Sequence, residues 1–284
     1  MTLATKPPRV RRARRRGFGI STALGIGAGG LWLSVIVLLP IAALVASALG
    51  SGIGPFWDAI TTESAISAFE VTFLTSAVVT VINAVVGLQI AWTLTRDDFP
   101  GRRFVDALID LPFALPTIVA SIVLLALYGA TSPVGIHVQQ TKYGVMVALL
   151  FVTLPFVVRS VQPVILELEK SVEEAAATLG ARPFVITRSV ILPALAPALL
   201  SGAGLAFSRA IGEFGSVVLI GGGIPRKTEV SSQYIRSLIE QDSPAAAAAV
   251  SVVLLVVSFV VLFVLRIVAS RLARKEAPSD TFVA

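Results

Sequence analysis

Arg209 and Glu213 are the residues whose types and spacing first suggest chemistry. They stand four apart in a stretch that is otherwise apolar and small, so a helix would place them on one face, where they can form an ion pair. A charge deep in a bilayer is costly and normally faces protein or a water-filled path. Two interpretations stay open: the arginine lies near a path and attracts an anion, or the pair only holds helices together.

A second polar segment, residues 171–179, has the pattern of a short helix. Ser171 can cap this helix, and Glu173 and Glu174 stand in its first turn, where the helix dipole favours negative charge. Alanines follow, and Gly180 can end the helix with a positive φ angle. We expect about two turns parallel to the membrane. The small alanine face can sit in a groove on a soluble partner.

Residues for other kinds of chemistry are scarce. The chain has no cysteine and one histidine, His137, which excludes disulfides and thiol nucleophiles and argues against histidine metal clusters. It contains no Gly-x-x-x-x-Gly-Lys-Ser/Thr phosphate loop. We expect no metal and no cofactor in this chain. The pI of about 10.2 reflects basic residues that act as topology signals, so no nucleic acid partner is expected.

The composition requires a lipid bilayer as solvent. Of the 284 residues, 55% are hydrophobic and 14% charged, against about 25% charged in an ordinary soluble domain. A membrane helix needs about 20 mainly apolar residues. Six stretches qualify: Ala23–Leu49, Phe69–Leu94, Ala107–Gly129, Tyr143–Ile165, Ala198–Gly222 and Ala245–Val268. The chain is therefore expected to be an all-α integral membrane protein with six transmembrane helices.

The basic residues are distributed unequally. Eighteen of the 23 fall in the N-terminal segment, the second and fourth loops and the C-terminal end, and four fall in the other loops. The positive-inside rule then places both termini in the cytoplasm, which an even number of spans satisfies. The first span has a basic start like a secretory signal. Its apolar run exceeds the roughly 7–15 residues of a signal core, so we expect an uncleaved anchor.

These boundaries divide the chain into three expected parts. Residues 1–21 form a basic cytoplasmic N-terminal arm whose composition predicts disorder outside a complex. Residues 22–270 form the membrane domain, with a cytoplasmic loop at about 166–197. Residues 271–284 form a cytoplasmic C-terminal tail.

Polar residues and prolines within the spans predict local features. Asn83 and Gln89 are expected to bond to neighbouring helices rather than to line a translocation path, and Asp110 to cap or pair locally rather than to contact the substrate. Pro112, Pro116 and Pro155 are expected to break or kink helices.

Two further features concern the fifth span. Gly212 and Gly215 would let another backbone approach closely. The run Thr187–Gly222 is too long for one span, and Pro193 and Pro197 predict a break in it.

The loop resembles a known family. Glu174-Ala175-Ala176, three residues, Gly180, nine residues and then Val190-x-Leu192-Pro193 is similar to the EAA loop of binding-protein-dependent ABC importers. The only departure is Val190, where the family pattern has isoleucine. The resemblance implies the type I ABC importer permease fold, with a cytoplasmic coupling helix, in a prokaryotic inner membrane.

The resemblance also implies a mechanism. The coupling helix docks onto an ATP-binding subunit, and nucleotide-driven closure of two such subunits moves the permease between inward-open and outward-open states. ATP and Mg would belong to those subunits, and this chain would not be an enzyme. The implied contact residues are Glu174, Ala175, Ala176, Gly180, Leu192 and Pro193.

A second resemblance concerns the substrate. Ser208–Val217 and Asp110–Val119 are similar to stretches of sulfate and molybdate permeases, and Gly223–Glu229 resembles an outer loop of the T-type subunit of sulfate/thiosulfate permeases. The match covers about residues 60 to 270. It implies import of sulfate and thiosulfate, an extracytoplasmic sulfate-binding protein, and a second permease subunit of the W type.

Two alternatives remain. A molybdate or tungstate importer is one, because those tetrahedral dianions are similar to sulfate. An ATP-independent secondary transporter is the other, although the sequence has no apparent inverted repeat or ring of pore charges.

Overall fold

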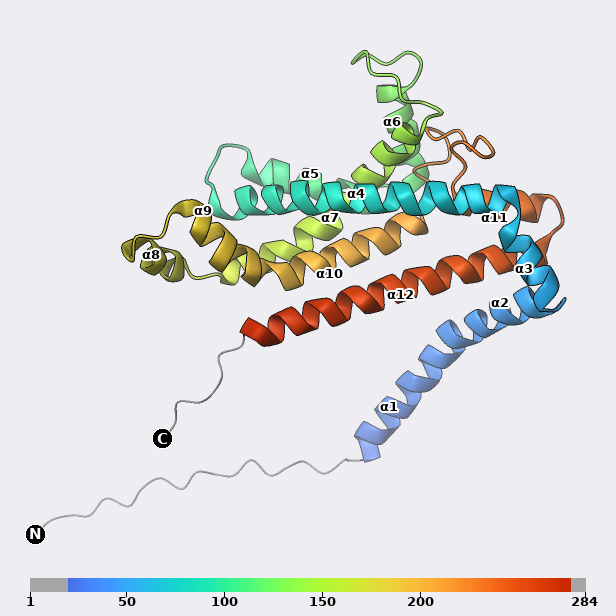
Figure 1. Ribbon diagram of the computed structural model, residues 1–284, viewed down its shortest axis with the longest axis horizontal. Coiled ribbons are helices and arrows are strands. Elements are labelled where there is room, and N and C mark those ends of the chain that lie inside the picture. Colours follow the sequence, from blue (N-terminus) through green and yellow to red (C-terminus); the bar gives the residue numbers. More distant parts are fainter. Residues whose placement is uncertain (1–19, 277–284) are drawn as a thin grey trace, which may run out of the picture. The chain divides into compact units, whose positions relative to one another are not determined.

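The computed structural model describes residues 20–276, and all regular elements in that part are helices (Figure 1). The all-α prediction is therefore confirmed for the described residues. Apart from residues 20 and 21, the predicted N-terminal arm lies outside them, as does the predicted tail beyond residue 276. The described residues divide into two compact units, with the boundary between Ala46 and Ser47.

The first unit contains one apolar helical segment. It consists of α1 (Ile20–Leu33), a π-helical turn η1 (Ser34–Leu38) and the greater part of α2 (Leu39–Leu49). The stretch Leu24–Leu49 is long and apolar enough to cross a membrane, in agreement with the predicted first span.

The second unit contains the remaining helices. In chain order they are α3 (Ile53–Thr61), α4 (Glu63–Arg96), α5 (Arg102–Ala114), α6 (Thr117–Tyr128), α7 (Lys142–Glu167), α8 (Lys170–Thr178), α9 (Pro183–Ile186), the π-helical turn η2 (Thr187–Ile191), α10 (Leu192–Ile211), α11 (Ser231–Glu240) and α12 (Pro244–Glu276).

Helices α4, α7 and α10 pack against one another, and α12 packs along α10 (Figure 1). Small residues allow this close packing. A Cβ atom on Gly87 of α4 would lie 2.9 Å from Val157 Cγ1 of α7, and one on Gly202 of α10 would lie 2.9 Å from Ser160 Cβ of α7. Without a hydrophobic force between helices in lipid, such contacts are a main source of association.

The predicted third span is bent. In the described part of the chain, five helices are long and apolar enough to be spans. Helices α5 and α6 are bent by 117° relative to each other, and they make a sixth span if the pair is counted as one. The break falls at Leu115 and Pro116, so the prediction for Pro116 is confirmed. Pro112 and Pro155 lie inside α5 and α7, and neither helix is interrupted there.

The predicted fifth span, Ala198–Gly222, is wrong at both ends. The helical run extends from Pro183 to Ile211, and no break occurs at Pro193 or Pro197. In η2 the ladder shifts to i→i+5 bonding, with Leu192 N–H donating to Thr187 O. Pro193 follows this wider turn at the start of α10, where a missing N–H is tolerated.

Candidate functional site

Helix α8 is the short helix that the sequence predicts, and it carries the first part of the loop motif. Glu174 and Ala175 are exposed, and Ala176 is half-buried. Gly180 adopts φ +86°, which confirms the predicted left-handed end. The predicted cap is wrong: Glu169 precedes the helix, and Ser171 Oγ donates to Glu169 Oε2 at 3.0 Å.

The second part of the motif lies elsewhere. Leu192 and Pro193 stand at the start of α10, beyond α9 and η2. Leu192 lines a hollow of about 550 Å³ together with Gln89 and Trp92 of α4. The two halves of the motif thus lie on different helices, but Ala176 of the first half and Val190 of the second pack against the same core cluster.

Exposed apolar side chains surround α8. Leu179 is 88% exposed and Phe184, at the start of α9, is 72% exposed, while Val172 and Val185 are each about half exposed. Exposed apolar side chains grouped in this way are typical of surfaces that contact another protein or the membrane. Sequence reasoning missed them, although Leu179 and Phe184 both flank the Gly180 turn.

The inner side of α8 is tied to α4. Arg96 Nη2 donates to Glu173 Oε1 and to the Leu168 carbonyl, both at 2.9 Å. In the sequence, Arg96 is one of the basic residues of the second loop that count only as topology signals, and no pattern joins residues 96 and 173.

Arg209 and Glu213 form the predicted ion pair. Glu213 lies beyond the end of α10, in the irregular segment 212–230, rather than on a helix face. Its side chain is 1% exposed and its Oε1 accepts from Ser216 N–H at 2.8 Å, while its carbonyl accepts from Ser232 Oγ at 2.6 Å. Arg209 remains 34% exposed. The pair therefore organises the segment between α10 and α11 and leaves part of the guanidinium accessible.

The irregular segment contains a second buried carboxyl group. Glu229 is buried and accepts a hydrogen bond from Ser237 Oγ at 2.9 Å. Burial raises the pKa of Glu229 above its ordinary value, and the Ser237 hydrogen bond opposes that rise.

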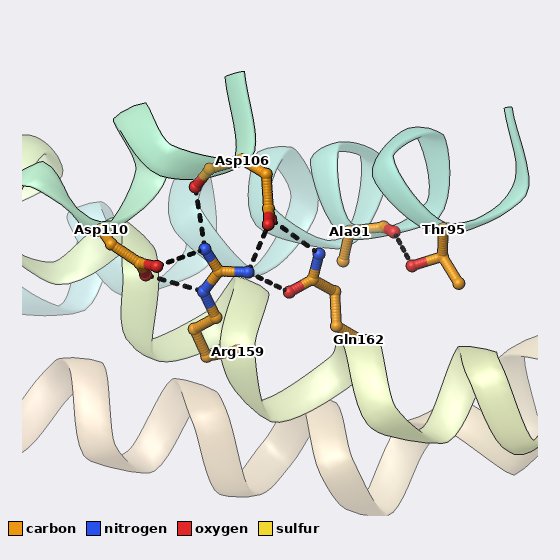
Figure 2. A network of polar contacts seen from close by, with 6 residues as sticks. All are labelled: Ala91, Thr95, Asp106, Asp110, Arg159 and Gln162. Atoms are coloured by element: carbon orange, nitrogen blue, oxygen red, sulfur yellow. Dashed lines mark hydrogen bonds and ion pairs between the residues drawn. The ribbon is translucent and has the colours of Figure 1, made fainter. Parts of the chain in front are cut away.

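Arg159 forms a polar network between α5 and α7 (Figure 2). Its guanidinium donates to Asp106 Oδ1, to both carboxylate oxygens of Asp110 and to Gln162 Oε1, at 2.6–2.7 Å. Asp110 therefore pairs across helices rather than within its own. Arg159 and Asp106 also line a cavity of about 920 Å³, which was not predicted.

The predicted polar contact of Asn83 is confirmed. Asn83 Nδ2 donates to Thr153 Oγ1 at 2.8 Å and to Leu150 O at 3.2 Å, which joins α4 to α7. Among residues 20–276 no group of three or more histidine, aspartate or glutamate side chains is placed to hold a metal ion.

Comparisons with known proteins converge on one family. The family described as "Binding-protein-dependent transport system inner membrane component" matches residues 86–274. The sulfate transport system permease protein CysT of Salmonella typhimurium is 42% identical over 259 residues, which is 89% of this chain and 94% of that protein. The protein of the same name in Synechocystis is 44% identical over 244 residues, or 84% and 85% of the two chains.

Solved structures agree on the fold. A chain of a bacterial alginate ABC transporter, in complex with its pentasaccharide-bound periplasmic protein, superposes with a TM-score of 0.71 at 16% identity, covering 88% of this chain and 93% of that one. A chain of the MetNI methionine ABC transporter, in an inward-facing conformation, gives a TM-score of 0.53 at 21% identity, covering 74% and 94%.

Proposed function

The chain belongs to the family of binding-protein-dependent transport system inner membrane components, and on that premise we propose that it is the permease subunit of an ABC importer that moves sulfate and thiosulfate into the cell. The observation that carries the substrate is the likeness, over nearly the whole chain, to permeases named for sulfate transport. The all-helical fold, shared with ABC transporter permeases, agrees with it.

The coupling to ATP is proposed to run through α8. The exposed Glu174 and Ala175, with Ala176 and the Gly180 turn, would contact an ATP-binding subunit, and the exposed Leu179 and Phe184 supply apolar area around them. Leu192 and Pro193 would hold the base of this surface at the start of α10. ATP and Mg would bind to two copies of that separate subunit, which would carry the ATPase activity.

The other parts of the assembly follow from the same proposal. A second permease subunit of the W type would complete the translocation path, and an extracytoplasmic sulfate-binding protein would deliver the anion. Both termini would face the cytoplasm of a prokaryotic inner membrane, with residues 1–21 as the arm, 22–270 as the membrane domain and 271–284 as the tail. Arg209 and Glu213 would act either on the path or as a structural pair.

Uptake of labelled sulfate tests the substrate. Cells that lack only this chain should lose uptake and regain it when the chain is restored, and excess thiosulfate should compete better than excess molybdate. If molybdate competes better, the importer would carry molybdate or tungstate instead. If sulfate uptake does not change when the chain is absent, the substrate assignment is wrong.

A further inference from the structure

Arg96 joins three segments at the base of α8. It is the last residue of α4, its Nη2 donates to the carbonyl of Leu168 immediately after α7, and the same Nη2 donates to Glu173 in the first turn of α8. Both distances are 2.9 Å. The guanidinium also lies over the ring of Trp92, 5.3 Å from its centroid.

The burial of these groups makes the link stronger than an exposed ion pair. The side chain of Arg96 is 11% exposed and that of Glu173 is 25% exposed. Exposed pairs contribute little because water screens them, and partial burial removes much of that screening. A cation is also favoured at the carboxyl end of α7 and over an indole ring.

The rest of α8 is held mainly on one side, where the half-buried Ala176 packs against the core of the second unit. No residue of α8 is buried, and Glu173, Glu174 and Ala177 line a hollow of about 360 Å³ between α8, Trp92 and the start of α9. At its far end Gly180 carries the chain away in a left-handed conformation. The ion pair with Arg96 and the packing of Ala176 are therefore the two contacts that fix the orientation of α8, and the ion pair is the one that joins it to the end of α4.

Two adjacent glutamates consequently have different surroundings. Glu174 is exposed, while Glu173 is partly buried and pairs with Arg96. We propose that Arg96 is a positioning residue that, by holding Glu173, transmits movement of α8 to the long span α4. This inference rests on the proposed coupling function, and it assigns to Arg96 and Glu173 a role that the loop motif does not contain.

The geometry suits such a transmission. Helix α4 is 34 residues long and packs along both α7 and α10, so a displacement of its end is carried through the second unit. Without the link, α8 could follow the ATP-binding subunit while α4 stays in place. ATP would then be hydrolysed with less sulfate moved.

The test uses the full importer reconstituted in lipid vesicles, with sulfate transported and ATP hydrolysed measured on the same sample. Arg96→Gln should lower the ratio of sulfate to ATP by about fivefold or more, the size of a typical coupling between sites. Arg96→Lys keeps the charge and should retain most of the ratio. Arg102→Gln is the matched control, because Arg102 pairs with the exposed Asp98 and has no hydrogen bond or ion pair with α8.

A distance measurement between α4 and α8 complements the transport assay. The chain has no cysteine, so cysteines introduced at Thr93 of α4 and Thr178 of α8, both exposed, are unique in it and can carry spin labels. The distance distribution between the labels should be narrow in the otherwise unchanged chain and broad with Arg96→Gln. The Arg102→Gln control should leave the distribution narrow.

An unchanged ratio of sulfate to ATP in assembled Arg96→Gln importers overturns the proposal. If Arg96→Gln does not assemble, Glu173→Gln is judged by the same ratio, and an unchanged value there overturns it equally. Failure of the proposed function would give a different result. Vesicles that contain the importer without substitutions would then take up sulfate without ATP, or would not take it up at all. In that case the label distances still show whether Arg96 orients α8.

Discussion

Gly215 lies directly against Thr117, so that the irregular segment after α10 meets the first residue of α6. A Cβ atom at position 215 would lie 2.9 Å from Thr117 Cβ and 3.0 Å from the backbone nitrogen of Ile118. The bend between α5 and α6 at Pro116 brings Thr117 to this place. A glycine is therefore required at position 215 for the two segments to touch.

Gly215→Ala should destabilise the chain by about 1–3 kcal/mol, because the added methyl group forces a backbone shift. The measurement is the thermal unfolding of the purified chain in detergent. Gly212→Ala is the matched control, since the nearest atom to a Cβ there is Ser208 O at 3.9 Å. Equal effects of the two substitutions would contradict the contact at Gly215.

Glu229 gives a prediction about pH. Because burial raises its pKa in the folded chain, the protonated carboxyl is favoured by folding. Its contribution to stability is then fully present below the unfolded pKa and is lost as the pH rises through the folded pKa. The Ser237 hydrogen bond reduces this loss.

Glu229→Gln should therefore raise the unfolding temperature at neutral pH and leave it nearly unchanged at acidic pH. The comparison is made with unfolding scans over a pH series in detergent. The control is Glu240→Gln, whose carboxylate is exposed and paired with Arg236 on the same helix. A difference between Glu229→Gln and the unsubstituted chain that does not depend on pH would argue against the raised pKa.

Much of the fold followed from apolar length alone. Spans such as Tyr143–Ile165 were predictable because a bilayer demands about 20 apolar residues, and the observed α7 differs by one or two residues at each end. The bounds of the fifth span were not predictable, because a proline in an apolar stretch can either end a helix or lie within it. Pro193 follows the π-helical turn η2, and Pro197 lies inside α10.

The site was predictable where a single residue type dictates a local conformation. Gly180 is such a case, since its positive φ follows from its place after an alanine helix. The pairs Arg96–Glu173 and Arg159–Asp106 were not predictable, because they join residues 77 and 53 positions apart in the chain. Their partners depend on how α4, α5, α7 and α8 pack, which no local pattern records.

Glu174 tests the docking surface. Glu174→Lys should abolish sulfate uptake, because it reverses an exposed charge at the proposed contact with the ATP-binding subunit. The amount of chain in the membrane should stay the same, since Glu174 has no structural partner among the hydrogen bonds and ion pairs of residues 20–276. Uptake and membrane content are measured together. The control is Glu167→Lys, which changes an exposed residue at the end of α7. Normal uptake by Glu174→Lys would contradict the docking proposal.

The pair Arg209–Glu213 allows its two interpretations to be separated. Arg209→Gln leaves the carboxylate of Glu213 buried without its cation, which should lower the free energy of unfolding by about 2 kcal/mol. This loss is smaller than for a fully buried pair, because Arg209 is one-third exposed. The amount of folded complex should fall. The double variant Arg209→Gln with Glu213→Gln removes both charges, and the amide oxygen at 213 can still accept from Ser216 N–H. If the pair is structural, the double variant restores the amount of complex and transports normally per complex. If Arg209 draws the anion along the path, the double variant assembles but transports less, so uptake divided by assembled complex decides between the two roles.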